Sequence, residues 1–279
     1  MSWQDTGTVA PKALSSARLK LHYGAFLLGS TAHSVLDHAA DDSHTNLGVD
    51  LDTGSLATRD LPGGLRLHLD FAQFALSLRA ITAAKAEVPL DGRTVDEALA
   101  WVGEALAADG TPVDIARREY PDFPDSPLLS GAAFAAPPAV ERTELGRWFG
   151  NAQTLFAGLG SREPRMTPPR VWPHHFDLGA LIPLSADGQV TIGVGFAPGD
   201  AHYDQPYFYC APYPVPAADT ALPALPIGHW TTDGMTSAIL TATELQAAEA
   251  TAGAQGAAAQ QYLDAAVAQC RELLQGSLS

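Results

Sequence analysis

Apolar residues recur every three or four positions in four segments, which is the spacing that places them on one face of an α-helix. The second segment opens with Thr94-Val95-Asp96-Glu97, the pattern of a capping box, and Gly110 predicts its end. The fourth segment is rich in Ala and Gln, and Gly253 and Gly256 predict a break in it. The predicted helices are residues 15–39, 94–110, 141–159 and 243–274.

Between these segments apolar residues alternate with polar ones, as in half-buried β-strands. The alternation slips by one position between Phe71 and Phe74, which predicts a bulge or bend near Gln73. Short turns such as Asp187-Gly188 join successive strands and favour antiparallel pairing. We therefore predict an α+β fold, an antiparallel sheet flanked by helices. The predicted strands are residues 47–51, 56–61, 65–78 with its bulge or bend near Gln73, 176–182, 190–196 and 207–211.

Five prolines lie in residues 120–138, which predicts a Pro-rich linker over 121–140. The linker would join an N-terminal half, 1–120, to a C-terminal half, 141–279, in one compact unit. Each half reads as a helix, three strands and a helix, so an internal duplication is one hypothesis. In this reading residues 42–47 and 173–178 hold corresponding places. The alternative is that any α+β chain can be divided in this way.

The composition of the chain excludes several classes of partner. Acidic residues outnumber basic ones 31 to 16, for a formal net charge of −15, and the bases are not clustered. Nucleic acids and anionic membrane surfaces need clustered Lys and Arg, so we expect neither as a partner. Two cysteines, Cys210 and Cys270, are too few for a disulfide framework, which favours reduced thiols. With no secretory signal at the start and no apolar run of membrane-spanning length, we expect a cytoplasmic protein.

Motifs of the common enzyme classes are absent from the sequence. It contains no phosphate-binding loop, no dinucleotide fingerprint after a strand, no nucleophile elbow, no C-x-x-C and no H-E-x-x-H. Candidate chemistry therefore has to come from the distribution of individual residues.

Histidines and carboxylates gather in two regions. One contains His33, Asp37, His38, Asp41, Asp42 and His44, and the other contains His174, His175, Asp177, Asp200, His202 and Asp204. Imidazole and carboxylate are the ligands that Zn, Fe and Mn sites use. We predict His44, His174 and His175 as ligands of a divalent metal. The alternative is that these histidines are solvated or hydrogen-bonded for structural reasons.

Catalytic roles are predicted for His175, Asp177 and Asp200. Pro173 predicts that a strand begins at this point, and in strand geometry His175 and Asp177 point the same way while Phe176 points into the core. Asp177 could then orient the imidazole, as in general bases and metal-bound histidines. If this side of the strand faces solvent instead, both are ordinary surface residues. Asp200 follows the turn Pro198-Gly199, where Gly is expected to take positive φ.

Aromatic residues predict a ligand-binding wall formed by Trp172, Tyr207, Tyr209 and Trp230. Residues 171–270 contain nine acids and neither Lys nor Arg. A pocket there would lack a fixed cation for an anionic ligand, so it predicts a neutral or cationic small molecule. The loop that carries Arg162, Arg165 and Arg170 is the nearby exception. In the alternative reading, the tyrosines fill a sheet face and hydrogen-bond locally.

Three strings of residues resemble a bacterial family of uncharacterised proteins, a domain of unknown function. They are Trp172-Pro173-His174-His175-Phe176-Asp177-Leu178, Gly195-Phe196-Ala197-Pro198-Gly199, and Tyr207-Phe208-Tyr209 followed by Tyr213-Pro214. The resemblance spans roughly residues 15–220. It implies one extended domain in a bacterial cytoplasmic protein, and it brings no activity and no functional residues.

Three functional hypotheses follow. The first is a small-molecule or metal-dependent enzyme with a His/Asp site between the halves. The second is a non-catalytic protein that binds a small molecule through the aromatic wall. The third is an interaction protein whose Pro-rich segment 212–226 docks a partner or a second copy of the chain, which would give a homodimer.

Overall fold

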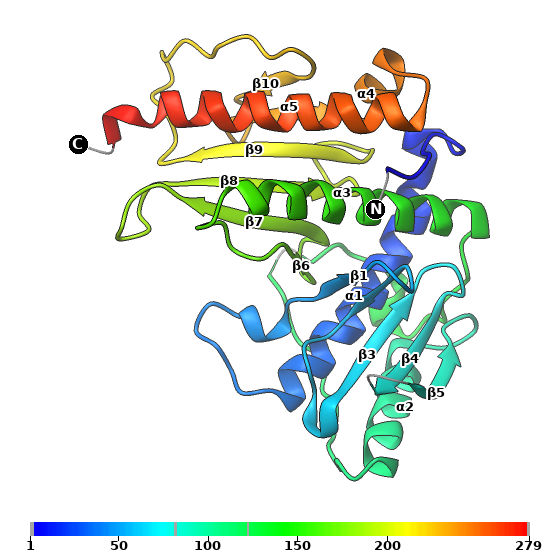
Figure 1. Cartoon of the computed structure of the whole chain (residues 1–279). Coiled ribbons are helices and arrows are strands. Elements are labelled where there is room, and N and C mark those ends of the chain that lie inside the picture. Colours follow the sequence, from blue (N-terminus) through cyan, green and yellow to red (C-terminus); the bar gives the residue numbers. More distant parts are fainter. Residues whose placement is uncertain (1–2, 81–82, 122, 278–279) are drawn as a thin grey trace. The chain divides into compact units, whose positions relative to one another are not determined.

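The chain forms α-helices and two antiparallel sheets, which confirms the predicted α+β class (Figure 1). The structure is a computed structural model that describes residues 3–80, 83–121 and 123–277. The chain divides into two compact units. Unit 1 comprises residues 1–13, 147–169 and 177–279, and unit 2 comprises residues 14–146 and 170–176.

The sheet of unit 2 follows the order of the chain, β1-β2-β3-β4-β5, with every neighbouring pair antiparallel. The strands are β1 (Gly48–Asp50), β2 (Ser55–Ala57), β3 (Leu65–Asp70), β4 (Ala75–Ala80) and β5 (Ala83–Pro89). β6 (Arg170–Trp172) also belongs to unit 2, where Val171 forms an antiparallel bridge with Leu47.

Two helices, α1 (Ser15–Val35) and α2 (Val95–Ala108), complete the core of unit 2. Strand alternation places Leu65, Leu67 and Leu69 on one face of β3, and all three are buried. α1 lies on this face, because a Cβ built on its Gly24 would meet the side chain of Leu69 at 2.7 Å. α2 opens with the predicted capping box of Thr94 and Glu97, which is confirmed. Arg66 and His68 therefore belong to the opposite face of the sheet.

Residues 121–140, predicted as a linker, lie within unit 2. Phe123 packs against His22, Tyr23 and Phe26 of α1, and the Tyr23 hydroxyl donates to the carbonyl of Pro124 at 2.7 Å. The prolines thus shape a segment that covers α1. The chain passes between the two units at four points, one of which, Gly146/Arg147, lies within α3 (Ala139–Arg162).

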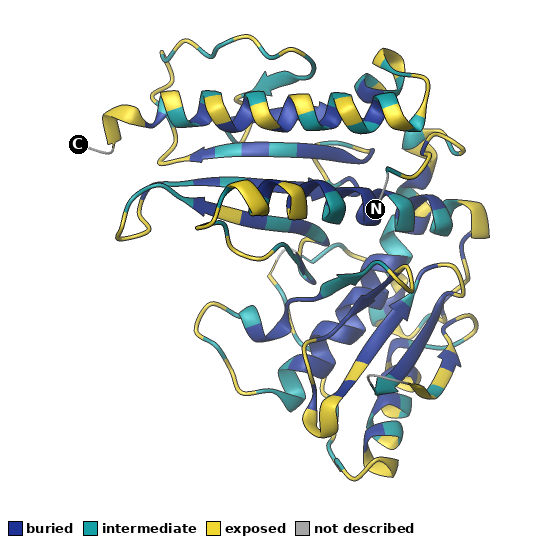
Figure 2. Cartoon of the chain, viewed as in Figure 1, coloured by how far each residue is buried: buried dark blue, intermediate teal, exposed yellow. Residues whose placement is uncertain are grey.

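The sheet of unit 1 has the strand order β10-β11-β9-β8-β7. Its strands are β7 (Asp177–Pro183), β8 (Thr191–Ala197), β9 (Tyr207–Tyr213), β10 (His229–Thr231) and β11 (Ser237–Thr241), followed by α4 (Ala242–Ala248) and α5 (Ala252–Leu273). α5 runs along β9 and turns its buried stripe toward the sheet (Figures 1 and 2). Short 3-10 helices occupy Pro11–Leu14, Ser43–Thr45, Pro62–Gly64, Pro127–Ser130 and Gln275–Ser277.

Helices cover one face of this sheet. Phe196 and Phe208 form a cross-strand pair on that face and contact Trp148 of α3. On the same face Cys210 meets Cys270 of α5, both buried and free, with their Sγ atoms 3.6 Å apart. Because side chains alternate along a strand, Tyr207 and Tyr209 of β9 belong to the face opposite that of Phe208 and Cys210.

Some elements differ from the sequence-based expectations. The one-position shift of the apolar alternation near Gln73 corresponds to a hairpin turn between β3 and β4, in which Phe74 has φ of 52°. The last helix is interrupted at 249–251 rather than at Gly253 or Gly256. The internal duplication is not confirmed, since the strand order of unit 1 departs from the sequential order of unit 2. No helix in the described part of the chain is long and apolar enough to cross a membrane.

Candidate functional site

Three histidines of unit 2 bring their ring nitrogens together, with one ligand atom from each lying within 4.8 Å of the others. His33 lies in the last turn of α1, His38 follows the end of that helix, and His44 lies in the 3-10 helix Ser43–Thr45. The helix terminus and the loop that folds back on it therefore create this three-histidine cluster. His44 is buried, His33 is half-buried and His38 is exposed, so the cluster is open on one side.

Arg118 lies against the cluster. Its Nη1 is 2.5 Å from His33 Nδ1, and its Nη2 pairs with Asp42 Oδ2 at 2.8 Å. The backbone N–H of Arg118 donates to Ser30 Oγ of α1 at 3.1 Å, which fixes the segment beside the helix. Asp42 has φ of 59°, and this left-handed conformation turns the chain before the 3-10 helix. A cation and an anion thus adjoin the three imidazoles.

Burial and positive neighbours keep two of the imidazoles in the neutral form. Desolvation lowers the pKa of His33, and Arg118, His38 and His44 lower it further. Desolvation and His38 also lower the pKa of His44, against the opposing effect of Asp42. A neutral imidazole has the free lone pair that a metal ion requires, so both shifts favour metal binding at neutral pH.

The hydrogen bonds of the cluster define which nitrogens carry lone pairs. The N–H of Ala39 donates to His44 Nδ1 at 3.1 Å, which assigns the proton of the neutral ring to Nε2. That Nε2 lies 3.0 Å from His33 Nδ1, which also faces Arg118. His38 Nε2 lies 3.0 Å from the carbonyl of His33, so it donates and leaves Nδ1 as an acceptor. In this arrangement His44 donates to His33 Nδ1, while Arg118 Nη1 adjoins both ring nitrogens of His33 and lies 3.0 Å from its Nε2.

His174 and His175, predicted as metal ligands, are not members of this cluster. They lie in a turn rather than at the start of a strand, because the N–H groups of His175 and Phe176 both donate to the carbonyl of Trp172. The expected strand geometry at these residues is therefore wrong, and β7 begins only at Asp177. His175 is exposed. His174 stacks on Tyr120 with a ring-centroid separation of 5.7 Å, and the burial of His174 lowers its pKa to about 4.

The turn is anchored by His22 of α1. His22 Nε2 lies 2.9 Å from the carbonyl of Pro173, and the ring stacks on Phe176 with a centroid separation of 5.1 Å. Burial lowers the pKa of His22 to about 3, so the imidazole is neutral and donates this bond. Phe176 is buried as expected, with φ of 58°. We assign His22 a structural role.

Four predicted site residues of unit 1 form two carboxylate–phenol pairs. The Tyr209 hydroxyl donates to Asp177 Oδ2 at 2.7 Å, and the Tyr207 hydroxyl donates to Asp200 Oδ2. Burial raises the pKa of both tyrosines, and the adjacent carboxylates raise it further. Asp200 Oδ1 also accepts from the N–H of His202 and Tyr203, which closes the turn at Gly199, where φ is 112° as expected. Both pairs lie within unit 1.

The predicted aromatic wall does not gather in one unit, since Trp172 belongs to unit 2 and the other members to unit 1. Trp172 is half-buried and packs edge-on against His174. Trp230 Nε1 donates to the carbonyl of Pro223 at 2.7 Å, which attaches the Pro-rich segment to β10. In that segment Tyr213 and Val215 are exposed.

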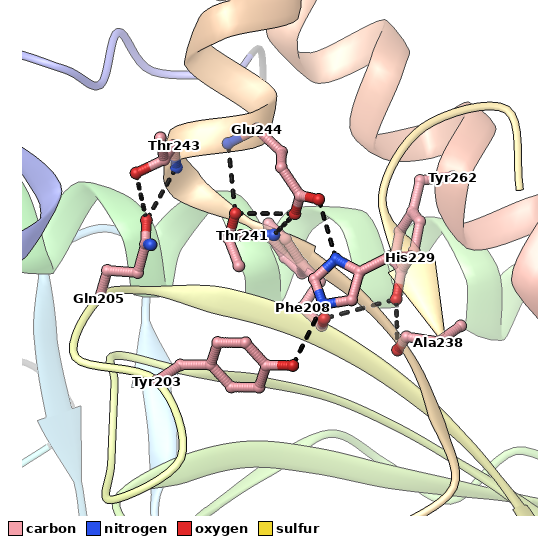
Figure 3. A network of polar contacts seen from close by, with 9 residues as sticks. All are labelled: Tyr203, Gln205, Phe208, His229, Ala238, Thr241, Thr243, Glu244 and Tyr262. Atoms are coloured by element: carbon pink, nitrogen blue, oxygen red, sulfur yellow. Dashed lines mark hydrogen bonds and ion pairs between the residues drawn. The ribbon is translucent and has the colours of Figure 1, made fainter. Parts of the chain in front are cut away.

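A further polar network joins β10 to α4 in unit 1 (Figure 3). Glu244 Oε2 accepts from the N–H of Thr241 in a capping box, and its Oε1 lies 2.8 Å from His229 Nδ1. Tyr203 Oη lies 3.2 Å from His229 Nε2. Burial opposes ionisation of Glu244, but the bonds from Thr241 and His229 outweigh it and lower its pKa. The spacing Thr241-x-x-Glu244 is a sequence signal of this cap.

Comparisons of the chain with protein-family models, with curated proteins and with solved structures find no match. The sequence identified the acidic, His-rich region that contains the three-histidine cluster, but it did not indicate Arg118. That residue comes from a segment without regular secondary structure and is 74 positions beyond His44.

Proposed function

We propose that the chain is a metal-dependent enzyme whose divalent metal is held by His33, His38 and His44. The observation that carries the proposal is the convergence of three imidazole nitrogens within 4.8 Å. Three protein ligands with a fourth position left to water or substrate are typical of catalytic zinc sites. Imidazole also suits Cu, Fe and Ni, so zinc is the first ion to test rather than the sole one.

The metal would supply a Lewis acid and a bound water of lowered pKa. Arg118 is placed beside the ligands, where its guanidinium would orient an anionic substrate. Asp42 in turn holds the guanidinium through its second nitrogen. We therefore infer an anionic substrate for this site, while the neutral or cationic ligand expected for residues 171–270 concerns a different part of the chain.

Metal binding at His33 would compete with two existing contacts. Arg118 has to withdraw from His33 Nδ1. If His44 Nε2 becomes a ligand, the proton of that ring has to move to Nδ1, which breaks the bond from the N–H of Ala39. Because a protonated imidazole has no free lone pair for a metal ion, binding is expected to weaken as the pH falls. Replacing Arg118 by Gln removes the competing cation and should leave metal affinity unchanged or higher.

The test is a titration of the protein with Co²⁺ followed by its visible absorption, with Zn²⁺ as the displacing ion. We expect binding of one metal ion per chain, and we expect His38→Ala to weaken it about 100-fold or more, since second-shell losses alone cost 10–100-fold. His38 is exposed, so this variant should keep its fold. The matched control is His175→Ala, an exposed histidine outside the cluster, which should bind as the wild type does.

Two outcomes would overturn the proposal. One is a wild-type protein that shows no cobalt absorption and no zinc displacement. The other is a His38→Ala variant that binds as tightly as the wild type while His175→Ala loses affinity, which would return the site to the turn at Pro173.

A further inference from the structure

A separate hollow of about 300 Å³ on unit 2 is lined by three arginines, Arg59, Arg66 and Arg170. It lies at the β1–β2 edge of the sheet, on the face opposite α1. The grouping is unexpected in a chain with a formal net charge of −15. The other lining residues are Gly48, Val49, Asp50, Ala57, Thr58 and Asp60.

Arg170 makes no hydrogen bond or ion pair with any residue in the described ranges. Its guanidinium is half-buried and lies close to Gly48, where a Cβ would be 3.1 Å from Nη1. Desolvation lowers the pKa of Arg170, and the positive charges of Arg59 and Arg66 lower it further. The guanidinium therefore has like-charged neighbours and no counter-ion of its own.

The carboxylates of the hollow are already engaged. Asp60 pairs with Arg66 at 2.6 Å. Asp50 Oδ1 accepts from the N–H groups of Asp52 and Thr53 and so closes the β1–β2 turn. Arg59 donates to neutral oxygens, the carbonyl of Ser43 and Asn46 Oδ1. Three guanidinium groups thus face two carboxylates, which leaves one positive charge uncompensated.

A larger hollow of about 630 Å³ adjoins the first, because Asp50 and Arg66 line both. In it Arg66 stands directly opposite Arg79 across β3 and β4, an arrangement of like charges that costs stability. Arg79 donates to Ser77 Oγ at 2.8 Å, and no carboxylate pairs with it among the described residues. His68 in the same hollow is neutral at pH 7, because burial lowers its pKa to about 4.

We propose that these arginines form an anion-binding site for the phosphate group of a small molecule, with Arg59 and Arg170 holding the phosphate and the adjoining hollow receiving the remainder of the ligand. Guanidinium groups match phosphate oxygens in shape and charge. A bound phosphate would also relieve the repulsion at Arg170 and between Arg66 and Arg79. The combined volume lies within the range of small-molecule sites. This site uses none of the three histidines and does not depend on the metal.

The experiment measures binding of inorganic phosphate and of glycerol 3-phosphate by calorimetry at constant ionic strength, with glycerol as the uncharged control. We expect both anions to bind and glycerol not to bind. Tighter binding of glycerol 3-phosphate would identify a phosphate monoester, and equal binding would identify free phosphate, as the occupant. Arg170→Gln should weaken the binding at least tenfold, and Arg170→Lys should restore part of it.

Arg93→Gln is the matched control, since Arg93 is also half-buried in unit 2 and its guanidinium donates to the carbonyl of Pro89. It should bind both anions as the wild type does. Cobalt binding by Arg170→Gln should be unchanged, which separates this proposal from that of the metal. The proposal is overturned if the wild type binds neither anion, if chloride at equal ionic strength competes as well as phosphate, or if folded Arg170→Gln retains wild-type affinity.

Discussion

At the scale of single residues, Gly195 on β8 shows how a missing side chain positions a polar contact. It stands opposite Tyr209 on β9, whose ring occupies the space where a Cβ would lie. A Cβ at this position would be 2.1–2.4 Å from Cζ, Oη and Cε1 of Tyr209, closer than real contacts allow. The ring can therefore lie over the sheet and bring its hydroxyl to Asp177 only because residue 195 is glycine.

We predict that Gly195→Ala lowers the free energy of unfolding by about 1–3 kcal/mol, since the added methyl group forces Tyr209 off its position and breaks its bond to Asp177. Urea denaturation measures the change. Gly193→Ala is the control on the same strand and face, where a Cβ would make ordinary contacts at 3.8–4.0 Å. It should be neutral or slightly stabilising. Equal effects of the two substitutions would contradict this account of the ring.

At the scale of elements, patterns that depend on local spacing were predictable. The capping box at Thr94 and the amphipathic segment that becomes α3 involve residues within a few turns of each other, so the sequence contains their cause. The hairpin of β7 and β8 is of the same kind. Short strands were harder to predict from the sequence. All three residues of β10 (His229–Thr231) are half-buried, so the strand has no alternation of buried and exposed positions.

The turn at Pro173–Phe176 was not predictable, because its cause is remote in sequence. The spacing of Phe176 and Leu178 resembles a strand, yet His22 donates to the Pro173 carbonyl from 151 positions away. That tertiary bond, with the stacking of Phe176 on His22, outweighs the local preference for an extended chain. The three-histidine cluster was predictable only in part. Its three histidines are near one another in sequence, whereas Arg118, which competes for His33, is remote from them in sequence.

At the scale of the whole molecule, the buried histidines couple folding to pH. Burial lowers the pKa of His22 to about 3, and those of His68 and His174 to about 4, and all three lie in unit 2. In the unfolded chain these imidazoles titrate near their ordinary value of about 6.5. Below that pH the unfolded chain binds protons that the folded chain does not, so folding becomes less favourable as the pH falls toward 4.

We predict that the free energy of unfolding decreases steadily between about pH 6.5 and 4, and that His22 alone contributes up to ~1.4 kcal/mol per pH unit. Urea midpoints measured across this range test it. His22→Gln can still donate to Pro173 but cannot titrate, so its stability should depend less steeply on pH. A wild-type stability that is constant or rises on acidification to pH 5 would contradict the assignment of neutral buried histidines.

The central claim is that His33, His38 and His44 hold a metal ion, and locating a bound ion by anomalous scattering tests it most directly. Crystals grown with Zn²⁺ should show one zinc peak about 2.0–2.1 Å from a nitrogen of each of the three histidines. The guanidinium of Arg118 should have left His33 Nδ1. Zinc found only at other residues, with Arg118 Nη1 still against His33, would contradict the account.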